Sequence, residues 1–179
     1  MFLNFTSPMP FAVTHVLASI IPADLYRDYV TKHKKHFTLF TILVAGIAGL
    51  LPDIDIPLSL IIHKLGYQVP LLFHRGFTHT LLFGLIFLIL GAILWNLKKK
   101  KWAILGVVAA FGISIHIILD LVISSGSSIM LFWPLSTRTF GMSLISEGAA
   151  LNLYAAIDAI LLVCWLVHEE IKHKIKDFI

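Results

Sequence analysis

Charged side chains are scarce in this chain, and cysteine is almost absent. Asp, Glu, Lys and Arg make up 13% of the 179 residues, whereas soluble domains carry about 25%. The single cysteine, Cys164, excludes an intramolecular disulfide and a zinc site built from cysteines. His-Glu-x-x-His, P-loop and Gly-x-Ser-x-Gly motifs are missing as well. Their absence argues against a zincin protease, a P-loop nucleotidase and an α/β-hydrolase serine enzyme.

Apolar residues are correspondingly abundant. They make up 58% of the chain, and the mean hydropathy is +0.91. A soluble globule of this size has too much surface for its volume to bury so many apolar side chains. The composition therefore indicates a helical membrane protein, and the length fits one integral membrane domain over residues 1–179.

Several apolar runs are candidates for membrane-spanning helices, which need about 20 residues each. Four are long and firm: Phe37–Leu51, Thr80–Leu97, Trp102–Ile123 and Ala150–Val167. A fifth, Phe11–Val30, is weaker because a proline and three charged residues interrupt it. The predicted fold class is all-α: a polytopic helical membrane protein with four firm transmembrane helices and a fifth at the N-terminus.

The basic residues gather at the ends of these runs. Eleven of the fourteen Lys and Arg fall into three clusters: Arg27–Lys35, Lys98–Lys101 and Lys172–Lys176. If each run spans once, all three clusters lie on one side, which the positive-inside rule makes cytoplasmic. We therefore expect an inner (plasma) membrane protein and no nucleic-acid partner. The loops 52–79 and 124–149 would face outward.

One polar pair lies inside an apolar run. His116 and Asp120 are spaced i, i+4, so a helix places both on one face. Ionisable groups inside a membrane helix are costly and usually functional. The pair predicts two metal ligands; the alternative is a buried hydrogen bond that only holds helices together.

Two further motifs map to the same expected leaflet. Asp53 and Asp55 are one residue apart, so in extended backbone both carboxylates can reach one site. The alternative is a pair of solvated acids at a helix end. His74 and His79 bracket Arg75, whose planar donor fork suits phosphate; the alternative is an ordinary polar loop.

His15, near the start of the first run, is a weaker candidate on its own, and its alternative is an interfacial histidine with no role. With it, the candidate metal ligands comprise four imidazoles and three carboxylates. They are His15, Asp53, Asp55, His74, His79, His116 and Asp120. A mixed set of this kind fits Zn, Mn or Fe better than Ca. One metal with an open position needs about three protein ligands. Seven ligands therefore suit two divalent ions, which can clamp the attacking and leaving oxygens in phosphoester hydrolysis.

The remaining polar residues have weaker assignments. Arg75 is the candidate for stabilising charge during the reaction, and Arg138 is a second candidate for holding an anionic head group, unless it is simply solvated. Glu147 is a candidate general base. Four histidines beside lysines are predicted to be solvated: His33, His36, His168 and His173.

The motifs form an ordered set along the chain. They are Thr14-His15, Leu-Leu-Pro-Asp-Ile-Asp ending at Asp55, His-Arg-Gly-Phe-Thr-His-Thr ending at Thr80, His116-x-x-x-Asp120, and Leu-Phe-Trp-Pro-Leu-Ser ending at Ser136 with Phe140-Gly141. This set resembles the YdjM-like family of predicted inner-membrane, metal-dependent hydrolases, over roughly His15 to Gly141. The resemblance implies an integral membrane hydrolase in which the seven His and Asp residues bind metal.

The function expected from the sequence is metal-dependent hydrolysis, in particular of a phosphoester in a membrane lipid or a lipid-linked phosphate at the outer leaflet. The active site would then be extracytoplasmic, and the partner would be a lipid. The main alternative is a divalent-metal transporter, which would use similar ligands near the midplane of the membrane. A non-catalytic membrane scaffold or regulator is the third possibility.

Overall fold

The fold is known from a computed structural model. It describes residues 12–32, 37–67, 75–123, 128–142 and 147–173, without the side chains of 147–152, 154 and 173. These residues are helical apart from turns, loops and one isolated β-bridge between Ile129 and Phe140. The prediction of an all-α chain is therefore confirmed for the part that the structure describes.

The helices follow the apolar runs, and short 3₁₀ turns carry Asp53 and the segment Phe77–His79. In chain order the elements are α1 (Ala12–Leu25), the π-helix η1 (Tyr26–Thr31), α2 (Leu39–Ala48), the 3₁₀ turn η2 (Pro52–Ile54), α3 (Asp55–Lys64), the 3₁₀ turn η4 (Phe77–His79), α4 (Leu81–Asn96), α5 (Lys100–Ile123) and α6 (Glu147–His173). Pro52 begins η2 just after α2, where the missing N–H of proline cannot continue a helix.

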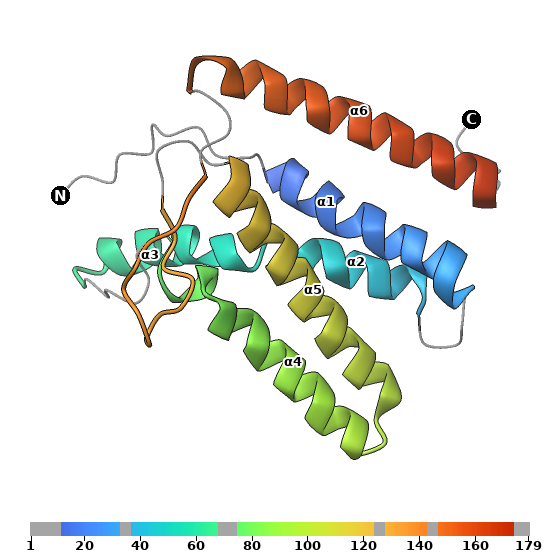
Figure 1. Cartoon of the computed structure of the whole chain (residues 1–179), viewed down its shortest axis with the longest axis horizontal. Helices are drawn as coiled ribbons and strands as arrows, with labels where there is room; N and C mark the ends of the chain where they lie inside the picture. The colour runs from blue at the N-terminus through green and yellow to red at the C-terminus, as the bar shows by residue number, and fades with distance from the viewer. Residues whose placement is uncertain (1–11, 33–36, 68–74, 124–127, 143–146, 174–179) are drawn as a thin grey trace.

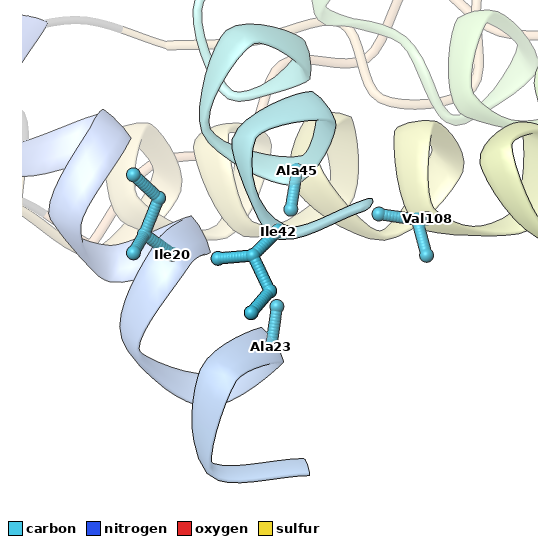
Figure 2. Close-up of a cluster of buried hydrophobic side chains, with 5 residues drawn as sticks. All are labelled: Ile20, Ala23, Ile42, Ala45 and Val108. Carbon is cyan, nitrogen blue, oxygen red and sulfur yellow. The ribbon is translucent and has the colours of Figure 1, made fainter. Parts of the chain in front are cut away.

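Helix α5 is the centre of the bundle (Figure 1). It packs against α4, α2 and α1, and α6 lies along the outer side of α1. The apolar core comes from three helices, with Ile20 and Ala23 on α1, Ile42 and Ala45 on α2, and Val108 on α5 (Figure 2). The turns η2 and η4 contact each other, and η2 also contacts α5.

Small residues let α5 approach its neighbours closely, as is common for helices in membranes. A Cβ added at Gly112 would meet the backbone oxygen of Ala45 and lie 3.0 Å from the Gly49 nitrogen. A Cβ at Gly106 would lie 2.9 Å from the Cα of Gly91 on α4. Both contacts involve backbone, which cannot rotate away, so α2 and α4 can pack this closely only against glycine.

The number of membrane spans is not established by these helices. Among the described residues, α5 alone is long and apolar enough to cross a membrane as a single helix. A second span results if α2 and the following segment Pro52–Lys64, bent by 50°, are counted as one. Helix α4 is apolar but shorter. The count of four firm spans and a fifth therefore stays a prediction.

Polar contacts fasten α6 to α1. Near the start of α1, the Thr14 hydroxyl donates to Asp158 Oδ1 at 2.7 Å. Near its end, the buried guanidinium of Arg27 lies 2.8 Å from Asp24 Oδ1 and 3.3 Å from Glu169 Oε1. An ion pair that is buried in this way is costly to break from one side, because the partner is left charged and desolvated.

The prediction that His168 is solvated is wrong, because His168 belongs to the same cluster. Its side chain is 23% exposed, and its Nε2 lies 3.2 Å from Asp28 Oδ2. Arg27 is likewise buried, although the sequence groups it with the exposed lysines. The reason is spacing, since Arg27 follows Asp24 by one helical turn and can fold back onto it. The sequence alone does not show that α6 covers this turn.

Substituting Gly112 by alanine is expected to destabilise the bundle. The added methyl group would push α5 away from Ala45 and Gly49, and overpacking of this kind costs about 1–3 kcal/mol. Gly84→Ala is the matched control, because a Cβ there has no neighbour closer than 3.6 Å. The measurement is thermal unfolding of the two variants in detergent. Equal melting temperatures for both variants would contradict the close approach of α2 and α5.

Candidate metal centre

Polar side chains from four parts of the chain meet at one end of the core. His15 comes from α1, Asp53 from η2, His79 from η4, and His116 and Asp120 from α5. The three histidines are 0–1% exposed, and Asp120 is 2% exposed. The spacing of His116 and Asp120 does place both on one helix face, as expected. Groups that are far apart in the sequence therefore form one buried polar cluster.

The protonation of His116 follows from its backbone contact. Its Nδ1 lies 2.7 Å from the carbonyl oxygen of Gly49, just after α2. A carbonyl oxygen can only accept a hydrogen bond, so Nδ1 carries the proton and donates it. The Nε2 of the neutral ring is then an unprotonated lone pair, and it faces His79, Asp53 and Asp120. This is how proteins orient histidines that bind metals.

His79 is oriented in the same way by a side-chain relay. The Thr78 hydroxyl donates to Asp55 Oδ2 at 3.0 Å, since an ionised carboxylate can only accept. The Thr78 oxygen is then left to accept from His79 Nδ1, which lies 3.1 Å away. In the neutral ring of His79, Nε2 would then be the nitrogen without a proton, and it faces His116 Nε2 at 3.2 Å.

With both rings neutral, the two Nε2 atoms and the two carboxylate oxygens that face one another are all acceptors. Asp53 Oδ1 lies 3.6 Å from His79 Nε2 and 3.5 Å from His116 Nε2. Asp120 Oδ2 lies 3.6 Å and 3.9 Å from the same two nitrogens. Four ligands placed tetrahedrally at Zn–N and Zn–O distances of about 2.0–2.1 Å are about 3.3 Å apart. The spacing and the chemistry of Asp53, His79 and His116 thus fit a single divalent ion, and Asp120 Oδ2 lies near both histidine nitrogens.

The charges point the same way. In their ordinary ionised forms Asp53, Asp55 and Asp120 carry three negative charges, and the buried guanidinium of Arg75 supplies one positive charge. Arg75 Nε lies 3.4 Å from Asp120 Oδ2. With neutral histidines, a mostly buried cluster would keep two uncompensated negative charges, which is costly in a desolvated site. A divalent cation balances this charge.

His15 extends the cluster on the other side of Asp120. Its Nε2 lies 3.6 Å from Asp120 Oδ1, and its ring stacks on that of His116 with centroids 3.8 Å apart. Its Nδ1 is buried and has no hydrogen-bond partner in the described part of the chain. The ligand atoms of His15, His116 and Asp120 also lie close enough together to hold an ion, but His116 Nε2 can serve only one of the two positions because its Nδ1 donates to Gly49. The Asp120 carboxylate can therefore face two metal positions.

Of the other predicted site residues, Asp55 lies next to the centre and Arg138 lies on the surface. Asp55 stands behind His79, where its Oδ2 accepts from Thr78 and from the Arg75 backbone N–H at 3.2 Å. Arg138 is exposed and lies over the Phe140 ring. His74 lies outside the described residues. Glu147 begins α6, but its side chain also lies outside the description.

Two groups that orient the histidines were missed by sequence reasoning. Thr78 holds His79, and the Gly49 carbonyl holds His116. Thr78 carried a local signal, because it lies inside the His-Arg-Gly-Phe-Thr-His motif beside a candidate ligand. The Gly49 carbonyl carried none, since any residue supplies a carbonyl and only the packing of α2 on α5 brings this one to His116.

Comparison with known proteins gives one match. No curated protein and no solved structure matches the chain. The family model described as "YdjM inner membrane protein" matches residues 9–174, which include every residue of the cluster. That range spans nearly the whole chain, from before α1 to the end of α6. The chain therefore belongs to the YdjM family of inner membrane proteins.

Proposed function

We propose that this inner membrane protein is a metal-dependent hydrolase. The observation that carries the proposal is the gathering of four potential ligand atoms, in which His79 Nε2 and His116 Nε2 face each other at 3.2 Å beside two aspartates. Facing lone pairs repel one another, and a metal ion bound between them relieves this repulsion. Mixed nitrogen and oxygen donors favour Zn, Mn or Fe over Ca. A bound ion of this type activates water and polarises a phosphoryl or carbonyl oxygen.

The ligands divide into two groups. His79, His116 and Asp53 would hold one ion, with Asp120 Oδ2 near both histidines, and His15 with the Asp120 carboxylate would contribute to another. Asp55 and Thr78 would hold the ring of His79 rather than contact the ion directly. Asp53 is the most exposed ligand, with 27% of its side chain accessible. Substrate and water would therefore reach the centre on the Asp53 side.

A phosphoester is the substrate bond that best suits the residues around the centre. Arg75 Nε contacts Asp120, so its guanidinium lies beside the proposed ligands, and the planar shape of a guanidinium suits phosphate oxygens. Stabilising the charge that develops on such oxygens is commonly the largest contribution to catalysis. Arg138 and Glu147 remain candidates for binding the head group and for acting as general base.

The proposed substrate is a membrane lipid or a lipid-linked phosphate. His116 lies seven residues before the end of α5, so it is about 10 Å along the helix from that end at about 1.5 Å per residue. A water-soluble substrate does not need a centre at this depth. With four firm spans and a fifth at the N-terminus, the lysine clusters would be cytoplasmic and the centre extracytoplasmic.

A divalent-metal transporter is the second candidate function. The cluster of Asp24, Arg27 and Glu169 at the far end of α1 favours it, because a second set of carboxylates lies nine residues from His15, about 13 Å along the helix. However, Arg27 already fills that cluster with a cation. Metal uptake by proteoliposomes without lipid hydrolysis would select this function instead.

Removing one metal ligand should abolish metal binding without unfolding the protein. Asp120→Asn keeps the shape of the side chain but replaces a carboxylate oxygen by an amide NH₂. This NH₂ can donate to the lone pair of His79 or His116, so it takes the place of the metal ion. We expect bound metal, measured by mass spectrometry on folded protein, to fall at least about 10-fold, together with turnover of a lipid phosphate. Asp158→Asn, which alters a buried aspartate outside the centre, is the control. Unchanged metal in Asp120→Asn would refute the ligand assignment.

Thr78 should act through His79. Thr78→Val removes the hydroxyl that accepts from His79 Nδ1, so the ring can turn or change tautomer, and metal affinity should fall about 10- to 100-fold. Thr78→Ser restores the hydroxyl and should restore affinity. The readout is metal affinity by competition with a chelating dye. If valine and serine give the same affinity, the relay from Asp55 to His79 does not operate.

Arg75 should separate metal binding from phosphate chemistry. A guanidinium does not ligate metals because it stays protonated, so Arg75→Lys should keep its metal. Loss of the bidentate fork should cost about 2–4 kcal/mol in the transition state, which is roughly 30- to 1,000-fold in rate. The measurement is turnover of a lipid phosphate per bound metal. Full turnover in this variant would point to a different ester or an amide as substrate.

A further inference from the structure

A concentrated positive charge lies at the end of the bundle opposite the candidate metal centre. Helices α4 and α5 are joined by a tight turn, in which Lys98 N donates to Trp95 O and Lys99 N donates to Leu94 O. Lys98 adopts a left-handed conformation with φ 60°. The turn and the start of α5 thus present four consecutive lysines, Lys98–Lys101, all of them exposed.

These lysines surround a cleft of about 610 Å³. Its other lining residues are Leu94 at the end of α4 and Trp102 on α5, and no acidic side chain contributes. Four neighbouring ammonium groups repel one another, so the cleft favours an anion. The N–H groups in the first turn of α5 add to its positive potential.

The border of the cleft is apolar and aromatic. Trp95 and Trp102 are 55% and 60% exposed, and Lys100 Nζ lies 5.8 Å from the Trp95 ring centroid. Exposed tryptophans beside lysines are typical of helix ends at a membrane interface. The outer side of α4 continues this border with exposed Leu90 and Ile93. A ligand that fills the cleft therefore needs an anionic group attached to apolar chains.

We propose that the Lys98–Lys101 turn binds the head group of an anionic phospholipid, with the acyl chains lying against the exposed side of α4. Clusters of basic residues next to a membrane helix recognise anionic lipids through their charge. This lipid is distinct from a substrate of the metal centre. Lys100 and His116 are sixteen residues apart on α5, which is about 24 Å along the helix.

The test compares lipid binding by the purified full-length chain. Phosphatidylglycerol and phosphatidylcholine with identical acyl chains are titrated separately, and bound lipid is counted by native mass spectrometry. We expect tighter binding of phosphatidylglycerol. Each lysine near a membrane surface contributes about 5-fold to such binding. The double variant Lys98→Gln/Lys100→Gln should therefore bind phosphatidylglycerol about 30-fold more weakly, with binding of phosphatidylcholine unchanged.

The matched control removes two exposed lysines elsewhere. Lys64 lies at the end of α3 and Lys172 lies near the end of α6, over the ring of Tyr29. Lys64→Gln/Lys172→Gln has the same net charge as the test variant and should bind phosphatidylglycerol like the unmodified chain. Equal loss in both double variants, or equal affinity of the unmodified chain for the two lipids, would overturn the site. Displacement of the lipid by inorganic phosphate at equal concentration would show a simple anion site and would overturn the lipid as occupant.

Discussion

The close contact between His79 Nε2 and His116 Nε2, 3.2 Å apart, is the interaction around which the polar contacts of this structure are arranged. Each nitrogen is held in its unprotonated form by a hydrogen bond at the opposite side of the ring, through Thr78 for one and the Gly49 carbonyl for the other. Two lone pairs and two carboxylate oxygens then point at one small buried volume. A cation in that volume would relieve the repulsion between these acceptors, and this chemistry underlies the proposed hydrolase.

The helix packing and the polar centre depend on the same backbone. Gly112 lets α5 lie against Ala45 and Gly49, and one turn further along α5, His116 reaches the carbonyl of Gly49. A change of a few tenths of an ångström in the distance between α2 and α5 therefore alters the hydrogen bond that fixes the His116 tautomer. In this chain the small residues in the helix contact serve the site as well as the stability of the bundle.

The sequence predicted the helical class and most members of the cluster, since apolar runs and the i, i+4 spacing of His116 and Asp120 are local signals. It could not assign the roles within the cluster. Asp55 looked equivalent to Asp53, yet the start of α3 turns it behind His79, where it accepts from Thr78. The burial of Arg27 and the contact of His168 with Asp28 were missed for the same reason, because each depends on α6 lying against α1. A contact between two helices that are distant in sequence cannot be predicted from the sequence of either helix alone.

Helix α5 determines how the chemistry is placed along the molecule. Its apolar length separates the lysine turn at its start from His116 and Asp120 near its end, and ionisable side chains are absent between Lys101 and His116. A cation at one end and an anionic head group at the other would each meet the charge opposite to their own, since the cluster carries excess carboxylate and the turn carries only lysines. Both ends of the helix would thus be neutralised by ligands rather than by each other, because they lie about 24 Å apart along α5 and no direct ion pair can span that distance.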